Sequence, residues 1–232
     1  MLTTVEHGYT NPFSVSRTAA GAFPYLTTAA SAELIRARFA DNKFRGIIHG
    51  PHGAGKTTLA LWLADCFCST FGHVSLITFR TKAATERMTL EKIRRAKQAA
   101  CELWIVDGLE NLNRFQCMGF LGCIRQRGSG IIATVHGNTA FGLPLIAAIN
   151  PEFDVFSKMV AQLLDGFPWR LDQEEIADSW NKSDGNFRLA FSLLYDLYEQ
   201  QSQIKKPITQ TQPRSLIHSQ HCSIASSSGR NV

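Results

Sequence analysis

The stretch "GPHGAGKTT" at residues 50–58 decides how the rest of the sequence is interpreted. It fits the pattern GxxxxGK[ST], with Gly50, Gly55, Lys56 and Thr57 at the four specified positions. At average residue frequencies, a chain of this length contains the pattern by accident in roughly one case in a hundred. The apolar run "FRGIIHG" precedes it, and "KTTLALWLADCFCSTF", rich in helix formers, follows it. We therefore expect a strand, a glycine loop and a helix in this order.

A glycine loop between a strand and a helix can surround phosphate oxygens with backbone N–H groups. Glycines permit the required dihedral angles and keep side chains out of the space that the phosphates need. In this pattern the ammonium group of Lys56 reaches the β- and γ-phosphates, and the hydroxyl of Thr57 binds Mg²⁺. The residues that we expect to bind the nucleotide are Gly50, Gly53, Ala54, Gly55, Lys56, Thr57 and Thr58.

A second anchor for the magnesium ion is usually an acidic residue that ends an apolar strand. The run "LWIVDG" supplies Asp107 at such a position. Taken alone, Asp107 would be interpreted as a turn former, because Asp-Gly is a common turn dipeptide. With the glycine loop upstream, we expect Asp107 and Thr57 to hold Mg²⁺ together.

Apolar runs and helical patterns alternate through the first two thirds of the chain. Helical patterns at 86–100 and 113–128 separate three β-rich runs, which are "HVSLITFR" (73–80), "CELWIVDG" (101–108) and "GSGIIATVHG" (128–137). Buried strands that alternate with helices predict a parallel sheet covered on both faces. The predicted fold class is therefore α/β, a doubly wound parallel sheet. The segment 151–166 predicts one last short strand followed by a helix.

The remaining segments predict the domain organisation. A helix is expected from Ala30 to Ala40, with Ser31 accepting the N–H bonds of its first turn. Beyond Pro168 the apolar residues recur at helical spacing without a strand pattern, and the end of the chain is polar and rich in serine. We divide the chain into an irregular N-terminal segment, an α/β core, a small helical lid and a disordered tail, at residues 1–30, 31–156, 157–201 and 202–232.

Composition excludes several classes of protein. The 232 residues, 44% apolar and 19% charged, are enough for one sizeable core and a small accessory subdomain. No run approaches the roughly 18 apolar residues of a membrane span, and the N-terminus lacks the layout of a signal peptide, so we expect no membrane partner and a cytoplasmic location. The six cysteines and seven histidines show no zinc-ligand or HExxH spacing. The net charge of +5 is modest and gives nucleic-acid binding only slight support.

With the glycine loop as Walker A and "LWIVD" as Walker B, the sequence resembles the P-loop NTPases, and among them the AAA+ ATPases. In the sequence one strand lies between the two motifs, as it does in the division of the P-loop NTPases that includes the AAA+ ATPases. The strand "IIATVHG" resembles the AAA+ sensor 1 strand, which implies that His136, or alternatively Thr134, places a polar side chain beside the γ-phosphate. "GNFR" at 185–188 is similar to the sensor 2 motif of AAA+ lids, which implies that Arg188 touches the γ-phosphate and couples nucleotide state to lid angle.

The sequence departs from the family immediately after Asp107. AAA+ proteins usually carry a catalytic Glu there, and this chain has Gly108. The nearest carboxylate is Glu110, which would orient the attacking water as general base if the chain hydrolyses ATP.

The second departure from the family concerns the arginine finger, which each subunit of an AAA+ ring supplies to its neighbour and which this sequence lacks at the usual position. No Arg occurs between Gly128 and Trp169, and Arg125 and Arg127 are the possible substitutes. Homo-oligomers remain possible, but a conventional ring loses support.

Three functions compete at this stage. The resemblance implies an ATP-binding, Mg²⁺-dependent ATPase switch that acts on a protein or nucleic-acid partner, with Glu110, His136 and Arg188 as its catalytic residues. The alternative is a nucleotide-gated binding or scaffold protein with negligible hydrolysis, motivated by Gly108 and the missing finger. A small-molecule kinase ranks last, because its lid would need more arginines than Arg170 and Arg188.

Overall fold

The fold was analysed in a computed structural model that describes residues 11–79, 91, 93, 94, 102–137, 142–167 and 170–204. The helix predicted at 86–100 lies outside the described residues, except for positions 91, 93 and 94, which are helical. The predicted tail also lies outside them from residue 205 onward.

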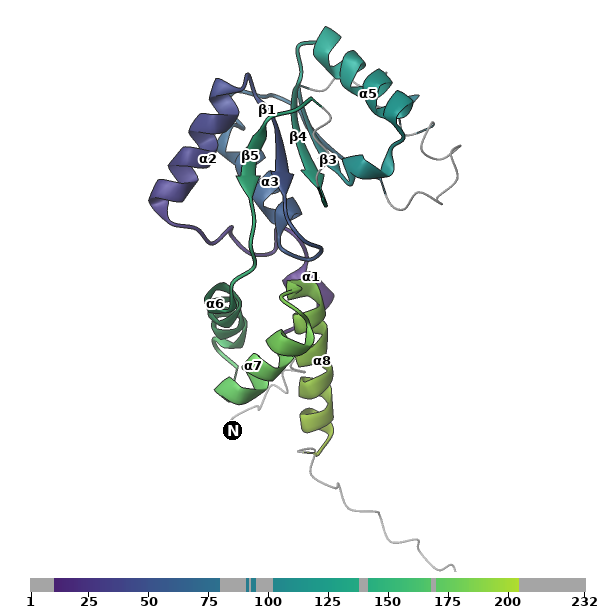
Figure 1. The fold of residues 1–232 in the computed structure, drawn as a ribbon. Helices are drawn as coiled ribbons and strands as arrows, with labels where there is room; N and C mark the ends of the chain where they lie inside the picture. Colours follow the sequence, from purple (N-terminus) through teal and green to yellow (C-terminus); the bar gives the residue numbers. More distant parts are fainter. Residues whose placement is uncertain are drawn as a thin grey trace, which may run out of the picture.

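A five-stranded, all-parallel sheet forms the centre of the molecule, in the order β2-β3-β4-β1-β5 (Figure 1). The strands are β1 (Arg45–His49), β2 (Val74–Thr78), β3 (Leu103–Asp107), β4 (Gly130–Val135) and β5 (Leu145–Ala148). In the register of the sheet, Thr134 lies beside Ile48 of β1 on one side and beside Asp107 of β3 on the other. The carboxyl ends of these three strands therefore meet at one edge. The predicted α/β fold with a parallel sheet is confirmed.

The prediction of a last strand within 151–156 is wrong. Helix α6 (Phe153–Leu164) begins there, and the fifth strand, β5, lies earlier in the chain. Phe153, Phe156 and Val160 follow one another at helical spacing and pack in one cluster, so this segment can bury its apolar side chains only as a helix. The sequence pattern did not predict β5, because a strand of 4 residues is too short to show a period.

Helices cover both faces of the sheet, as a doubly wound fold requires. On one face α2 (Ala29–Asp41) and α3 (Lys56–Cys66) bury Phe39, Leu59 and Leu63 against the strands. On the other face α5 (Arg114–Gln126) buries Phe120 and Ile124, and it follows the 3₁₀ turn η1 (Leu109–Asn111). Each face therefore has a hydrophobic core of its own.

The predicted N-cap of the first long helix is wrong by one turn. Helix α2 begins at Ala29, and the side chain of Thr28, rather than that of Ser31, accepts a hydrogen bond from a backbone N–H. The donor is the N–H of Ser31 itself, at 3.2 Å. Thr and Ser are both good N-caps. The N-cap here is Thr28, because its backbone is extended, as an N-cap residue requires.

The chain's C-terminal helices pack beside the sheet rather than on it (Figure 1). We call α6, α7 (Gln173–Lys182) and α8 (Phe187–Ile204) the helical region. Its core contains Phe156, Ile176 and Phe191, together with Phe13 from the N-terminal segment, which is 2% exposed. Phe13 and Phe23 both stack on the ring of Phe191. The core of the helical region thus includes residues from both ends of the described chain.

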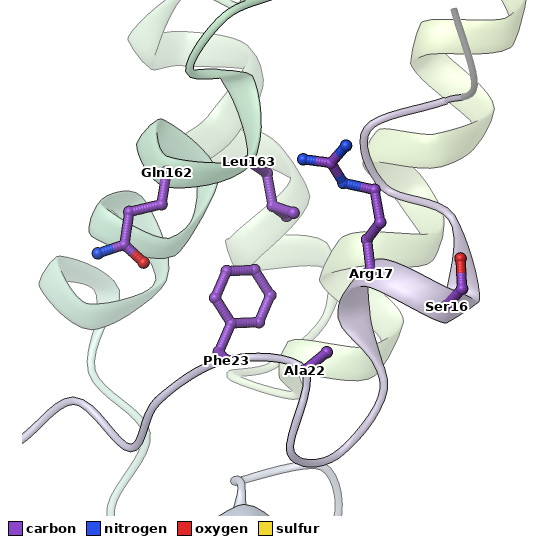
Figure 2. Close-up of a pocket in the computed structure, with 6 residues that line it drawn as sticks. All are labelled: Ser16, Arg17, Ala22, Phe23, Gln162 and Leu163. Atoms are coloured by element: carbon purple, nitrogen blue, oxygen red, sulfur yellow. The ribbon is translucent and has the colours of Figure 1, made fainter.

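Residues 11–28 connect the helical region to the sheet. The side-chain amide of Asn11 donates to the carbonyl oxygen of Tyr195 at 3.0 Å, and further along Tyr25 packs its ring on Trp62 of α3. Between the short helix α1 (Val15–Thr18) and α6 lies an open pocket of about 370 Å³ (Figure 2). Its lining residues are Ser16, Arg17, Ala22, Phe23, Gln162 and Leu163. Among the described residues, no helix is both long and apolar enough to cross a membrane.

Candidate functional site

The glycine loop, residues 50–55, leaves the sheet at the carboxyl end of β1, where parallel α/β sheets bind ligands. Gly55 has a φ of +89° and caps the start of α3. A Cβ at Gly55 would meet no atom within 4 Å. Open space therefore adjoins the N-terminal end of α3, where the helix dipole favours anions.

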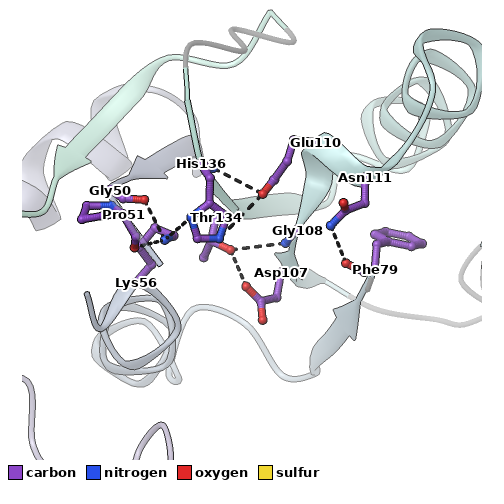
Figure 3. A network of polar contacts seen from close by, with 10 residues as sticks. All are labelled: Gly50, Pro51, Lys56, Phe79, Asp107, Gly108, Glu110, Asn111, Thr134 and His136. Carbon is purple, nitrogen blue, oxygen red and sulfur yellow. Dashed lines mark hydrogen bonds and ion pairs between the residues drawn. The ribbon is translucent and has the colours of Figure 1, made fainter. Parts of the chain in front are cut away.

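Lys56 lies inside this loop and is 5% exposed (Figure 3). Its ammonium group donates hydrogen bonds to the carbonyl oxygens of Gly50, at 2.8 Å, and Pro51, at 2.6 Å. A third partner is the Nδ1 atom of His136, at 3.0 Å. Burial lowers the pKa of Lys56 to about 8, while the negative charge of Glu110 counteracts that fall. Lys56 is therefore still mainly an ammonium ion at pH 7.

Thr134 and Asp107 form a pair at the ends of β4 and β3. The buried hydroxyl of Thr134 donates to Oδ1 of Asp107 at 2.5 Å and accepts from the N–H of Gly108 at 3.4 Å. Of the two residues considered for the sensor 1 position, Thr134 in β4 thus contacts the carboxylate, and His136 just after β4 contacts Lys56.

Glu110 lies in η1 and approaches His136 from the other side. One of its oxygens, Oε1, accepts from the backbone N–H of His136 at 3.3 Å and lies 3.8 Å from Nε2 of the imidazole ring. Its second oxygen, Oε2, is buried and has no hydrogen-bond partner within the described part of the chain. A buried carboxylate oxygen without a partner is costly, which is typical of a site that binds a ligand.

Gly108 shows why no carboxylate follows Asp107 directly. Its φ is +80°, and a Cβ there would lie 2.4 Å from the carbonyl oxygen of Phe79. That same oxygen accepts a hydrogen bond of 2.8 Å from the side-chain amide of Asn111. The backbone of the β2 end thus occupies the space that any side chain at position 108 would need.

The start of α8 lies against the glycine loop. Asn186 caps the helix, because its Oδ1 accepts from the N–H groups of Arg188 and Leu189, at 3.1 and 3.2 Å. A Cβ on Gly53, which has a φ of +71°, would lie only 1.8 Å from this Oδ1 atom. Arg188 is close enough to lower the pKa of Lys56 electrostatically. The structure therefore brings the "GNFR" segment to the loop.

No protein-family model matches the sequence, and no curated protein matches it significantly. Among solved structures, AMPPCP-bound DnaA from Aquifex aeolicus superimposes with a TM-score of 0.50, at 15% sequence identity, over 81% of this chain and 70% of that one. The chain has the AAA+ P-loop fold. An identity this low shows the fold alone, and the roles of individual residues depend on the geometry above.

Within this AAA+ fold the other predicted site residues divide into two groups. Ala54 is buried in the loop, and Thr57 and Thr58 are half-buried in the first turn of α3. Arg125 and Arg127 lie at the end of α5 that leads into the start of β4, at the edge of the sheet opposite the glycine loop. They do not join the site of their own chain. The described residues hold no group of three or more His, Cys, Asp or Glu side chains that could bind a metal ion by themselves.

Two contacts of the site were not predicted from the sequence. Asn186 touches Gly53, and the rings of His52 and His136 stack. An Asn directly before a helix is an N-cap signal, so the capping role could have been found. The stacking could not, because 84 positions separate the two histidines.

Proposed function

We propose that the protein binds ATP together with Mg²⁺ at the glycine loop, and that bound nucleotide sets the position of the helical region. The observation that carries this proposal is the convergence of four elements on one loop. Lys56 of α3, Asp107 of β3, His136 directly after β4 and the start of α8 all lie at its rim.

The residues present fit a magnesium nucleotide. Open space adjoins Gly55 at the N-terminal end of α3, and Lys56 supplies one positive charge beside it. Thr57 and Asp107 would hold the magnesium ion, whose chemistry is to neutralise charge on the phosphates. The DnaA structure that resembles this chain was solved with AMPPCP, which supports a nucleotide as the ligand.

The chain's own residues would have separate roles in hydrolysis. Thr134 fixes the orientation of the Asp107 carboxylate, and Glu110 would accept a proton from the attacking water. Arg188 would place positive charge beside the terminal phosphate, and Asn186 ties that helix start to the loop. The protein would act as an ATPase switch toward a protein or nucleic-acid partner, and its lid would be the helical region.

A second candidate function is a nucleotide-gated binding or scaffold protein with negligible turnover. The geometry of Gly108 favours it, because the usual position of the catalytic carboxylate has no room for a side chain. The two candidates differ in whether Glu110 substitutes for the missing residue.

One experiment tests both candidates. ATP binding and steady phosphate release are measured with Mg²⁺ for the unaltered protein, Lys56→Ala and Glu110→Gln. Loss of one charge-assisted contact should weaken ATP binding about tenfold to a hundredfold in Lys56→Ala. Turnover that disappears in Glu110→Gln, with binding retained, supports the ATPase switch, whereas binding without turnover in the unaltered protein supports the gated scaffold.

Two exposed residues of the helical region supply matched controls, Lys158→Ala for the lysine and Glu174→Gln for the glutamate. Neither change should alter binding or turnover. An unaltered protein that does not bind ATP, ADP or other nucleoside triphosphates would overturn the proposal.

A further inference from the structure

His52 and His136 stack their imidazole rings at the mouth of the site. The ring centroids are 3.5 Å apart, and the ring planes differ by 25°. His52 belongs to the glycine loop and is exposed, whereas His136 follows β4 and is partly buried. Among the described contacts of the site, the one that involves His52 is this stacked ring.

The imidazole of His136 connects two charged groups. Its Nδ1 atom lies 3.0 Å from the Lys56 nitrogen, and its Nε2 atom lies 3.8 Å from Oε1 of Glu110. An ammonium group has only donors, so Nδ1 must accept. In a neutral ring the proton is then on Nε2, and it points toward the carboxylate of Glu110. Burial first, and then the charges of Lys56 and His52, lower the pKa of His136 to about 4. A backbone hydrogen bond with Gly50 and the charge of Asp107 raise the pKa but only partly offset this fall, so the ring is neutral at pH 7.

This arrangement depends on the plane of the ring. The terminal torsion of a histidine side chain is broad, so a ring without packing partners samples many orientations. Rotation out of the stacked plane would move Nδ1 away from Lys56 and Nε2 away from Glu110. Among the described contacts, the stacked ring of His52 packs on the face of this imidazole, while Lys56 and Glu110 meet its edge.

We propose that His52 is a positioning residue that acts through His136. Its ring fixes the plane of the His136 imidazole, so that Nδ1 accepts from Lys56 and the Nε2–H faces Glu110. The inference rests on the proposed nucleotide function and makes it specific. If the terminal phosphate of ATP binds beside Lys56, the adjacent His136 ring would meet the third phosphate, so the stack would contribute to preference for ATP over ADP.

The first test measures the affinities for ATP and ADP in His52→Ala, His52→Phe, His136→Ala and the double variant His52→Ala/His136→Ala. The ATP-to-ADP preference should fall about threefold to tenfold in His52→Ala, in proportion to an aromatic contact. His52→Phe, which keeps a ring, should restore the preference to within about twofold. The double variant should have the same ATP-to-ADP preference as His136→Ala, because His52 acts only through the His136 ring. The proposal is overturned if the ATP-to-ADP preference is unchanged in His52→Ala. It is also overturned if His52→Ala and His136→Ala lower the preference equally and the two losses add in the double variant.

The second test needs no nucleotide, so it separates failure of this inference from failure of the proposed function. Nitrogen-15 NMR of the imidazoles at pH 7 reports the tautomer of His136, assigned by its loss in His136→Ala. The unaltered protein should carry the proton on Nε2, and His52→Ala should move the signals toward the tautomer average. His73→Ala, which removes an exposed histidine at the opposite edge of the sheet, is the control. A proton on Nδ1 in the unaltered protein, or an identical tautomer in His52→Ala, contradicts the proposal.

Discussion

Two loops leave the same edge of the sheet, and they use glycine for opposite purposes. The glycine loop follows β1 and leaves empty space beside Gly55, where a Cβ would touch nothing within 4 Å. The turn after β3 is filled, and a Cβ on Gly108 would lie 2.4 Å from the Phe79 carbonyl oxygen. Both glycines have positive φ angles. A positive φ therefore does not distinguish a ligand-binding loop from a tightly packed turn. The free space around the glycine does distinguish them.

The end of β4 supports each of these loops with a different side chain. Thr134 bonds to Asp107 and Gly108 of the β3 turn, and His136 contacts Lys56 of the glycine loop. The two residues are separated by one position and differ in burial, because Thr134 is 0% exposed and His136 is near the mouth of the site. Four predictions test this comparison, from the largest expected effect to the smallest.

Gly108→Glu, which places a carboxylate where AAA+ proteins usually have it, should lower the free energy of unfolding by about 4 kcal/mol. The reason is the contact with the Phe79 backbone in addition to the strained φ. Gly128→Glu is the matched control, because Gly128 has a φ of +70° and open space. It should cost about 1 kcal/mol. Urea unfolding of both variants checks this, and equal losses would mean that the backbone contact does not matter.

Gly53→Ala should cost about 3 kcal/mol, because the new methyl group would overlap the Asn186 side chain at a position with positive φ. Asn186→Ala alone should cost about 1 kcal/mol through the lost helix cap. The double variant removes the overlap, so its loss should be smaller than the sum. Unfolding measurements on all three proteins give the coupling energy, and simple additivity would contradict the contact between the loop and α8.

The stability contributed by His136 should depend on pH between about 6.5 and 4. Burial, with the charges of Lys56 and His52, lowers the pKa of His136 from 6.5 to about 4. In this window the unfolded chain binds a proton that the folded protein does not, so stability falls as the pH falls and is constant above 6.5. Relative to His136→Asn, the unaltered protein should lose about 2 kcal/mol between pH 7 and pH 4.

Lys56→Met provides the control for this pH dependence. It removes one of the charges that depress the pKa of His136, so the loss on acidification should be smaller in that background. If the difference in unfolding free energy between the unaltered protein and His136→Asn stays constant from pH 7 to pH 4, the pKa of His136 is not lowered in the folded protein.

Thr134→Val keeps the shape of the side chain and removes its hydroxyl. Asp107 then loses the donor at 2.5 Å, and the N–H of Gly108 loses its acceptor. We expect a loss of about 1 kcal/mol in unfolding free energy and weaker Mg²⁺ dependence of ATP binding. Ser75→Ala, in β2 beside Trp104 rather than beside Asp107, is the control for the loss of a strand hydroxyl. Unchanged magnesium dependence in Thr134→Val would show that the hydroxyl does not orient Asp107.

The first half of the fold was well predicted by the sequence. The strand before the glycine loop, the helix after it and three further strands lie where the apolar runs indicated. Strands β1, β3 and β4 are buried on both faces, so their sequences are continuous and apolar, whereas the edge strand β2 is partly exposed. Strand β5 was missed because its 4 residues show no period, and the first turn of α2 was misassigned because Thr28 and Ser31 are both good caps.

Two further contacts lay beyond what sequence could predict. The aromatic residues of the irregular N-terminal segment, Phe13 among them, indicate that it packs on the core, but no local pattern shows that Phe13 completes the core of the helical region. The stacking of His52 on His136 joins a loop to a strand end 84 positions away. Such contacts depend on how elements pack, and a local pattern carries no information about a partner that is far away in the chain.

By itself the sequence determined the glycine loop, the parallel sheet and the presence of Asp107, Glu110, His136 and Arg188 near strand or helix ends. Local propensity and hydrophobic periodicity decide these features, because they depend on neighbours within a few residues. Only the tertiary structure decided that Thr134 faces Asp107 while His136 faces Lys56, that Asn186 meets Gly53, and that position 108 must be glycine. These depend on strand register and on distances across the sheet edge, which exist only after the chain has folded.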